Sequence, residues 1–220
     1  PIVFSICEWG STKPWEWAQG IGHLWRATGD IINMWDGKED WGGHGMVNII
    51  DLVQDLYPYN GPGHWNDPDM LEVGNGGMTT IEDQSHFSMW CMLAAPLMAG
   101  NDLNNMSEDT KRILTNKDVI AIDQDPLGIQ AHLSVAMGDR QIWVKQLAND
   151  EWAVCFFNRG DNAWSLNFNW SDIPELRKAG GNLSVYDLWQ HKTIAKSTAK
   201  NVVSSIPSHG VLMVRLTPVK

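Results

Sequence analysis

Hydrophobic and polar positions divide the chain into two parts with different periodicities. Before residue 128, short apolar runs that end in polar residues predict buried strands at 2–6, 24–32, 64–71 and 93–102. Helical spacing and helix-start signals predict helices at 14–19, 46–56, 79–92, 107–114 and 118–123. Four strand-then-helix units in about 125 residues predict half of an eight-stranded βα barrel.

Local signals mark where several of these helices begin and end. Pro14 suits a first helical turn, and the second predicted helix is expected to end before Pro58. Thr79 and Glu82 have the spacing of a capping box, in which each side chain bonds the other residue's backbone N–H. Ser107 is expected to cap the fourth helix.

The pattern changes after residue 128. Short strands at turn-sized spacing, several with alternating polarity, are predicted at 141–147, 151–157, 163–168, 183–189 and 211–216. Turn-forming residues at 158–161 and 179–182 separate some of them. This pattern predicts an antiparallel β-sandwich. We therefore expect the partial barrel at residues 1–130 and the sandwich domain at residues 131–220.

Composition excludes several classes of partner. The chain has 220 residues, 43% of them hydrophobic, and its 13 tryptophans exceed what a core needs, so several are expected to line a surface cleft. A net charge of −10 argues against a nucleic acid or an anionic membrane as partner. No run of about 18 apolar residues occurs, so no membrane-spanning helix is expected.

The cysteines and the first residues add two expectations. Cys7, Cys91 and Cys155 are far apart and lack metal-ligand spacing, so we expect no metal, no cofactor and no disulfide. Residues 1–7 have the character of a buried strand and not of a charged, cleavable leader. We therefore expect the chain to begin inside a larger fold.

The stretch at 61–78 concentrates candidate chemistry. Asp67, Asp69 and Glu72 follow Trp65 between prolines and glycines that restrict the backbone. Sugar hydroxyls donate to carboxylates and sugar ring faces pack on aromatic rings, so this stretch is expected to form one wall of a sugar site. The alternative is an acidic turn whose aspartates bond their own backbone.

Charged residues also follow the other predicted strands. Arg26 and Asp30 come from the end of the second βα unit, and Glu8, Asp69 and Asp102 come from the ends of its neighbours. Strand ends of a βα barrel converge on one face, so these side chains are expected to share a cleft. For Arg26 and Asp30 the alternative is an ion pair on one face of a helix.

Five motifs carry a family resemblance. They are Cys7-Glu-Trp-Gly, Trp25-Arg-Ala-Thr-Gly-Asp-Ile31, Gly61-Pro-Gly-His-Trp-Asn-Asp-Pro-Asp-Met-Leu71, Ala95-Pro-Leu and Ile122-Asp-Gln-Asp-Pro-Leu-Gly128. In this order they resemble the second half of the family 27 glycoside hydrolases, the α-galactosidases. The resemblance covers almost the whole chain, including Tyr186-Asp-Leu-Trp189 in the predicted sandwich. It implies the C-terminal half of a (β/α)8 TIM barrel followed by an antiparallel β-sandwich domain.

The resemblance also implies an activity. A retaining α-galactosidase removes terminal α-D-galactosyl residues from oligosaccharides, polysaccharides or glycoconjugates by double displacement, using two carboxyl groups. By motif match, Asp30 corresponds to the acid/base, and Arg26 to the arginine that holds the sugar's 2-hydroxyl and orients that carboxyl. The family's attacking aspartate lies in a Lys-aromatic-Asp string that does not occur in this sequence. An N-terminal half-barrel is therefore the expected partner of this chain.

Further contacts with the sugar follow from the same resemblance. Asp69 matches an acceptor for sugar hydroxyls, and Met70 is expected to line the same pocket. Cys7 and Trp9 match positions that contact the 2-hydroxyl, while Glu8 takes their place if the first strand is shifted by one residue.

Other interpretations of the chain remain open on the sequence. One is a non-catalytic galactose-binding module, and another is a neighbouring specificity, α-N-acetylgalactosaminidase or β-L-arabinopyranosidase. Members of this family suggest a secreted, periplasmic or lysosome- or vacuole-like location. Assembly into an oligomer is compatible with every one of these interpretations.

Overall fold

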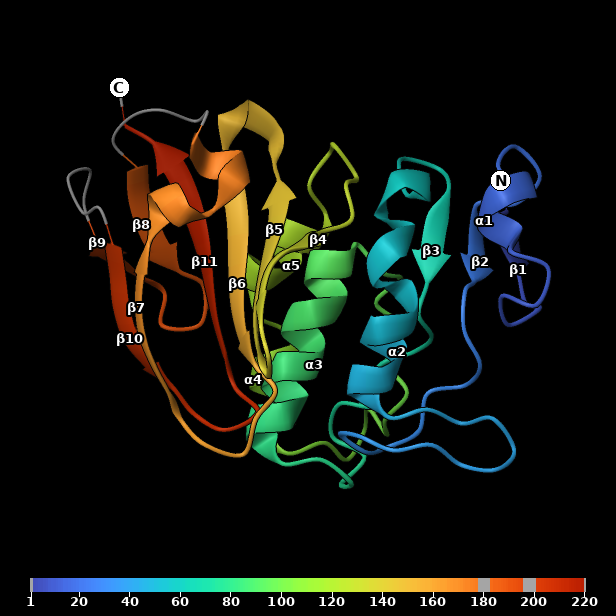
Figure 1. The fold of residues 1–220 in the computed structure, drawn as a ribbon. Helices are drawn as coiled ribbons and strands as arrows, with labels where there is room; N and C mark the ends of the chain where they lie inside the picture. The colour runs from blue at the N-terminus through green and yellow to red at the C-terminus, as the bar shows by residue number, and fades with distance from the viewer. Residues whose placement is uncertain (1, 178–182, 196–200, 220) are drawn as a thin grey trace.

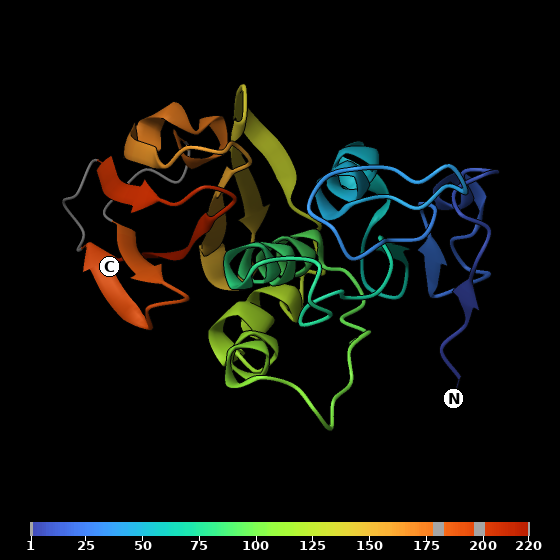
Figure 2. The same cartoon turned by 90° about the horizontal axis from the view of Figure 1, so that it is seen from below.

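A computed structural model describes residues 2–177, 183–195 and 201–219 of the chain. A small parallel sheet lies at the N-terminal side of the molecule, a β-sandwich lies at the C-terminal side, and helix α3 (Thr80–Leu93) lies between them (Figure 1). Seen from below, the N-terminus and the parallel strands are again on the side opposite the sandwich (Figure 2). The expected order of a partial barrel followed by a sandwich is thus present.

The parallel sheet has the order β1-β2-β3, with β1 at Ser5–Ile6, β2 at Leu24–Arg26 and β3 at Trp65–Asp67. All of its strand pairs are parallel, and the register joins Arg26 to Asp67. Each strand is shorter than the apolar run that predicted it. Strands β2 and β3 end at the charged residues Arg26 and Asp67, which brings these residues to the carboxyl edge of the sheet.

Helices follow these strands, as predicted. Their bounds are α1 (Pro14–Trp17), α2 (Met46–Val53), α3, α4 (Glu108–Leu114) and α5 (Lys117–Asp123). The capping box is formed, because Thr79 accepts from the N–H of Glu82 while the Glu82 carboxylate accepts from the N–H of Thr79. Ser107 caps α4 as expected. The helix predicted to end before Pro58 instead continues as a 3₁₀ turn, η1 (Gln54–Tyr59), because the fixed φ of proline fits a helical turn.

The prediction of a fourth strand at 93–102 is wrong in its extent. Helix α3 runs to Leu93 and stops at Ala94, whose backbone is left-handed with φ 52°. Pro96 then removes a backbone donor from the segment. Among the described residues, this segment joins the sheet through one isolated parallel bridge between Leu71 and Ala99. It occupies the place of a strand beside β3 without forming a ladder.

The C-terminal part is a sandwich of two antiparallel sheets. The larger has the order β4-β5-β6-β11-β8-β9 and the smaller pairs β7 with β10. Their bounds are β4 (His132–Met137), β5 (Arg140–Gln146), β6 (Trp152–Asn158), β7 (Trp164–Asn169), β8 (Leu183–Asp187), β9 (Lys192–Ala195), β10 (Asn201–Ile206) and β11 (Val211–Pro218). Three short 3₁₀ turns join them: η2 (Ala148–Asp150), η3 (Trp170–Asp172) and η4 (Pro174–Arg177). The sequence did not predict β4, β9 or β10, and the expected turn at 179–182 lies outside the described residues.

The central strands of the larger sheet, β5, β6 and β11, carry buried side chains on both faces. Ile142, Val154 and Val214 point toward the smaller sheet, whereas their neighbours Trp143 and Cys155 point toward α3. Period-two alternation therefore separates two layers of mostly apolar side chains. Eleven residues of α3 are buried, which is the pattern of a helix enclosed on all sides.

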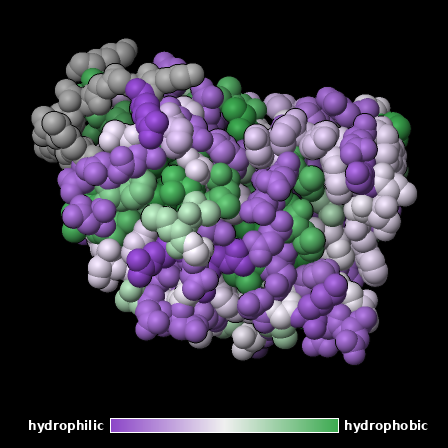
Figure 3. Space-filling view, viewed as in Figure 1, coloured by the Kyte–Doolittle hydropathy of each residue, from purple (hydrophilic) through white to green (hydrophobic). Residues whose placement is uncertain are grey.

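The surface of the molecule is mostly polar on the face drawn in Figure 3. On the face drawn in Figure 3, hydrophilic residues predominate, and hydrophobic residues show in patches over the sandwich and near the middle of the molecule. None of the helices in the described part is long and apolar enough to cross a membrane. The three cysteines are free thiols, with Cys7 exposed and Cys91 and Cys155 buried.

One lysine lies in the layer between the sandwich and α3. Lys145 of β5 is 1% exposed, and its ammonium donates to the carbonyl of Cys91 at 3.1 Å near the end of α3. Burial lowers the pKa of Lys145 to about 8, although the charge of Asp123 acts in the opposite direction. Burial likewise raises the pKa of Asp123 to about 6. Each of the two charges partly offsets the effect of burial on the pKa of the other.

This buried lysine predicts a pH dependence of stability. Because Lys145 titrates near 10.5 when unfolded and near 8 when folded, it binds fewer protons in the folded chain between these values, and its contribution to the free energy of unfolding should rise with pH across that window. The buried thiols of Cys91 and Cys155, whose pKa values burial raises, act in the opposite direction at the upper end of the window, so the contribution of Lys145 is the difference between the parent and a variant that lacks it. Lys145→Met should remove up to about 3 kcal/mol of this rise. Urea unfolding at pH 7.5 and pH 10 measures it.

The matched control is Lys111→Met, which changes an exposed lysine on α4. It should leave the difference between the two pH values as in the parent chain. An equal difference in the Lys145→Met chain and the parent would contradict the assignment of the pH dependence to Lys145.

Candidate active site

The parallel register brings two charged segments to the same edge of the sheet. Arg26 is the last residue of β2 and lies opposite Asp67, the last residue of β3. Beyond the strands, the N–H of Ala27 still donates to the carbonyl of Asp67 at 2.9 Å. The residues that follow both strands, Asp30 and Asp69, therefore leave the sheet side by side.

Arg26 joins these two carboxylates. Its Nη2 lies 2.9 Å from Oδ1 of Asp30 and 2.7 Å from Oδ2 of Asp69. The side chains of Arg26 and Asp69 are 13% and 14% exposed, while that of Asp30 is 39% exposed. The alternative of a helical ion pair is wrong, because residues 27–45 lie between β2 and α2. Arg26 also keeps a buried Nε–H with no partner among the described residues.

Asp69 is fixed from several sides. Its Oδ2 accepts from the N–H of Ile31 at 2.8 Å, and its Oδ1 accepts from the N–H of Met70 at 2.7 Å. Its backbone is left-handed with φ 85°, a conformation that residues other than glycine adopt at some energetic cost. Trp90 of α3 donates its indole N–H to the carbonyl of Asp69 at 2.8 Å, which holds this turn against the core.

Asp67 and Glu72 are buried, and their carboxylates bond to neighbouring residues of the same segment. Asp67 is 5% exposed and accepts from the N–H of Asp69 at 2.9 Å, so it shapes the turn. Burial raises the pKa of Asp67, although this hydrogen bond and the charge of Arg26 lower it. Glu72 is 6% exposed, accepts from the side chain of Asn75, and also has a pKa raised by burial.

The expectation that Trp65 and the three carboxylates form one wall is wrong. Trp65 begins β3, and its side chain lines a cavity of about 480 Å³ together with Leu24, Pro62 and Asp123. This cavity lies at the strand beginnings, whereas Asp69 follows the end of β3. The two parts of the stretch are separated because a strand runs between them.

The residues that follow β1 divide into two groups. Cys7 and Trp9 are exposed, and Trp9 has a left-handed backbone with φ 61°. Glu8 instead accepts from the N–H of Thr12 at 2.7 Å and closes a local turn. Met70, next to Asp69, is 36% exposed.

Asp102 does not join the group around Arg26. Its carboxylate accepts from the N–H of Asn104 at 3.0 Å and closes its own turn. No group of three or more His, Cys, Asp or Glu side chains that could hold a metal occurs among the described residues. The site therefore consists of one arginine between two partly buried carboxylates, of which Asp30 is the more exposed. Such a group can bind hydroxyls and move a proton.

Sequence reasoning missed a buried hydrogen-bond network that joins β2 to β3 beneath the site. Trp25 donates its indole N–H to Oδ1 of Asn66 at 2.8 Å, and Asn66 donates to the carbonyl of Leu56 and to Oε1 of Gln130 at 2.8 Å each. This buried network fixes β2 against β3. Only the presence of an amide side chain inside a predicted strand, directly after Trp65, could have suggested it.

Comparisons with known proteins agree with this arrangement. The family model described as "Alpha galactosidase A" matches residues 1–125, and the one described as "Alpha galactosidase C-terminal beta sandwich domain" matches residues 137–216. "Alpha-galactosidase A" of Cellvibrio japonicus is 46% identical over 99% of this chain and 56% of its own length. "Alpha-galactosidase" of Cyamopsis tetragonoloba is 41% identical over 99% of this chain and 50% of its own length.

Solved structures give the same result. The crystal structure of α-galactosidase I from Mortierella vinacea superposes with a TM-score of 0.93 and 32% identity, covering 99% of this chain and 59% of that one. The chain thus spans about half the length of the curated relatives it matches. The predicted fold class, a C-terminal half-barrel followed by a β-sandwich, is confirmed. The chain belongs to family 27 of the glycoside hydrolases, the α-galactosidase family.

Proposed function

We propose that this chain supplies the acid/base side of a retaining α-galactosidase site that removes terminal α-D-galactosyl residues. The observation that carries the proposal is the position of Arg26, whose Nη2 contacts both Asp30 and Asp69 at the carboxyl edge of the parallel sheet. Matched relatives named α-galactosidases support the substrate class.

The geometry suggests a role for each carboxylate. Asp30 is the more exposed of the two, and among the described residues its carboxylate accepts a hydrogen bond only from Arg26. It can therefore reach an oxygen that leaves the anomeric carbon. Asp69 is held by two N–H groups and Arg26, so its remaining lone pairs suit it to accept from sugar hydroxyls. Arg26 orients both carboxylates and is placed to bind the 2-hydroxyl.

The proposed reaction has two steps. A carboxylate attacks the anomeric carbon as Asp30 gives its proton to the departing oxygen. Asp30 then takes a proton from water, whose oxygen attacks the same carbon and releases the first carboxylate. Cys7, Trp9 and Met70 are proposed to line the sugar pocket, because each is exposed beside a strand end.

We propose that a second half-barrel supplies the attacking carboxylate. Strand β1 pairs only with β2 in the described part of the chain, which leaves one strand edge open. Ile2, Val3 and Phe4 before it are 86%, 71% and 52% exposed. Strands that continue the sheet beyond β1 would cover these side chains. The secreted, periplasmic or lysosome- or vacuole-like location expected from the family stays a prediction.

Asp30→Asn tests the acid/base role. Assembled with a half-barrel that completes the barrel, the parent chain should hydrolyse an alkyl α-galactoside, and the variant should lower kcat by about 10² to 10⁴, the range of general acid–base catalysis. Asp40→Asn, an exposed aspartate in the same loop, should keep the parent rate. Parent-like turnover by Asp30→Asn would remove Asp30 from this role. Saturable galactose binding without any turnover would favour a binding module.

Asp69→Asn tests the binding role. Asparagine tolerates the left-handed backbone at this position, so the turn should persist while the charge that pairs with Arg26 is lost. Hydrogen bonds to charged groups contribute about 1.5–3 kcal/mol, so the Kd for galactose should rise by about 10- to 100-fold. Titration of tryptophan fluorescence with galactose measures this. An unchanged Kd would show that the sugar does not contact Asp69.

A further inference from the structure

We infer that a turn of the β-sandwich, through His209, positions the loop that carries Asp30. The inference rests on the proposed function, because it concerns the acid/base of that site. On this inference the sandwich helps to hold Asp30 in place, and His209 is a positioning residue.

Backbone hydrogen bonds join the two ends of the loop at 27–45 to each other and its middle to α2. His44 donates its N–H to the carbonyl of Asp30 at 2.9 Å, and Ile32 donates to the carbonyl of His44 at 2.9 Å. Near its middle, the carbonyl of Trp35 accepts from the N–H of Val47 in α2 at 3.0 Å. A displacement of Trp35 is therefore transmitted through backbone hydrogen bonds to Asp30, five residues earlier.

The indole of Trp35 packs on the sandwich. Its ring stacks on the imidazole of His209 with centroids 4.5 Å apart and an interplanar angle of 15°. It meets the ring of Phe157, at the end of β6, edge-on at 5.7 Å. Stacked and edge-on aromatic contacts of this kind are directional, so they fix the ring's orientation as well as its position.

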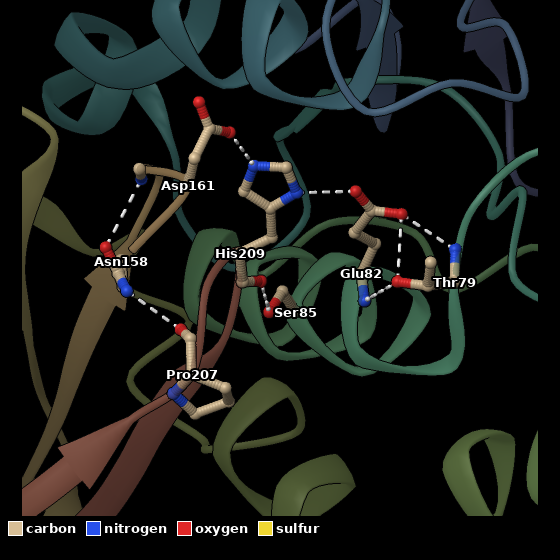
Figure 4. Close-up of polar contacts among 8 residues, drawn as sticks. Thr79, Glu82, Ser85, Asn158, Asp161, Pro207 and His209 are labelled. Carbon is tan, nitrogen blue, oxygen red and sulfur yellow. Dashed lines mark hydrogen bonds and ion pairs between the residues drawn. The ribbon is translucent and has the colours of Figure 1, made fainter. Parts of the chain in front are cut away.

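His209 is itself held at both ring nitrogens. Its Nδ1 lies 2.6 Å from Oε1 of Glu82, and its Nε2 lies 3.2 Å from Oδ1 of Asp161 (Figure 4). Its carbonyl accepts from the hydroxyl of Ser85 at 2.6 Å. Glu82 also closes the capping box with Thr79, so the imidazole is attached to the first turn of α3. The backbone of His209 is left-handed, with φ 56°.

A second contact strengthens the same junction. Arg159, in the turn after β6, makes two parallel hydrogen bonds to Asp51 of α2 at 2.7 and 2.8 Å. Helix α2 receives the far end of the Asp30 loop. The sandwich therefore contacts both the loop that carries Asp30 and helix α2, which follows this loop.

This support matters because the Asp30 side chain has few contacts of its own. Among the described residues it is bonded only to Arg26, so its position follows the position of the loop. A misplacement of about 1 Å in a reacting group can lower a rate by about 10²-fold. The loss should be largest for a poor leaving group, which depends most on protonation by the acid.

His209→Asn tests the inference in the completed barrel. Asparagine adopts the left-handed backbone readily, but the stacked ring is lost. We expect kcat/KM for an alkyl α-galactoside to fall about tenfold or more at unchanged KM, while kcat/KM for a dinitrophenyl α-galactoside, whose leaving group needs no proton in the first step, changes less than twofold. Hydrogen–deuterium exchange should become faster at 31–45 and stay unchanged in β5 and β6.

His191→Asn is the matched control. His191 also has a left-handed backbone, with φ 51°, and its Nδ1 lies 2.7 Å from a carboxylate of the barrel part, Asp118 of α5. It is not among the residues that pack on Trp35. It should leave the exchange of the loop and the dependence of kcat/KM on the leaving group as in the parent.

The outcomes separate this inference from the proposed function. If the parent hydrolyses both substrates and His209→Asn matches His191→Asn, or lowers kcat/KM equally for both substrates, the inference is wrong and the proposed function stands. If the parent hydrolyses neither, the proposed function fails, and faster exchange at 31–45 in His209→Asn alone would still show the structural contact. Should His209→Asn not fold, Trp35→Phe shrinks the same stack from the loop side and is judged by the same comparison.

Discussion

The guanidinium of Arg26 holds the site together. It is mostly buried, and a buried cation is stable only when it is paired, which Asp69 and Asp30 provide. The contact requires the parallel register that sets Arg26 opposite Asp67, and this register in turn rests on the buried bonds of Asn66. A shift of one residue between β2 and β3 would turn Arg26 away from the edge and separate the carboxylates.

The sandwich and the half-barrel are joined through α3. This helix is enclosed by both parts, and it contributes Trp90 to the turn at Asp69 and Glu82 to the contact with His209. Lys145 adds a polar bond to its last turn, inside an otherwise apolar layer. The two parts therefore share one core. Such a junction can transmit the position of a sandwich turn to a loop at the sugar site.

Part of this structure was readable from the sequence. The capping box of Thr79 and Glu82 located α3, and the rule that parallel strand ends converge brought Arg26, Asp30 and Asp69 together before any coordinates were known. Other features depend on tertiary packing and leave no periodic signal. The apolar residues after α3 form one bridge instead of a strand, Trp65 faces the opposite end of its strand, and Trp35 meets His209 from a distant part of the chain. The edge strand β10 buries few of its residues, so its pattern was too weak to predict.

The central claim is that a single hexose lies at the carboxyl edge of β2 and β3, between Asp30 and Asp69. A crystal structure of the chain assembled with a completing half-barrel and soaked with galactose tests it most directly. We expect the sugar hydroxyls to contact Asp69 and Arg26, and the anomeric oxygen to point toward Asp30. Galactose bound in the cavity lined by Trp65 at the other end of the strands, with Asp30 turned away from it, would contradict the account.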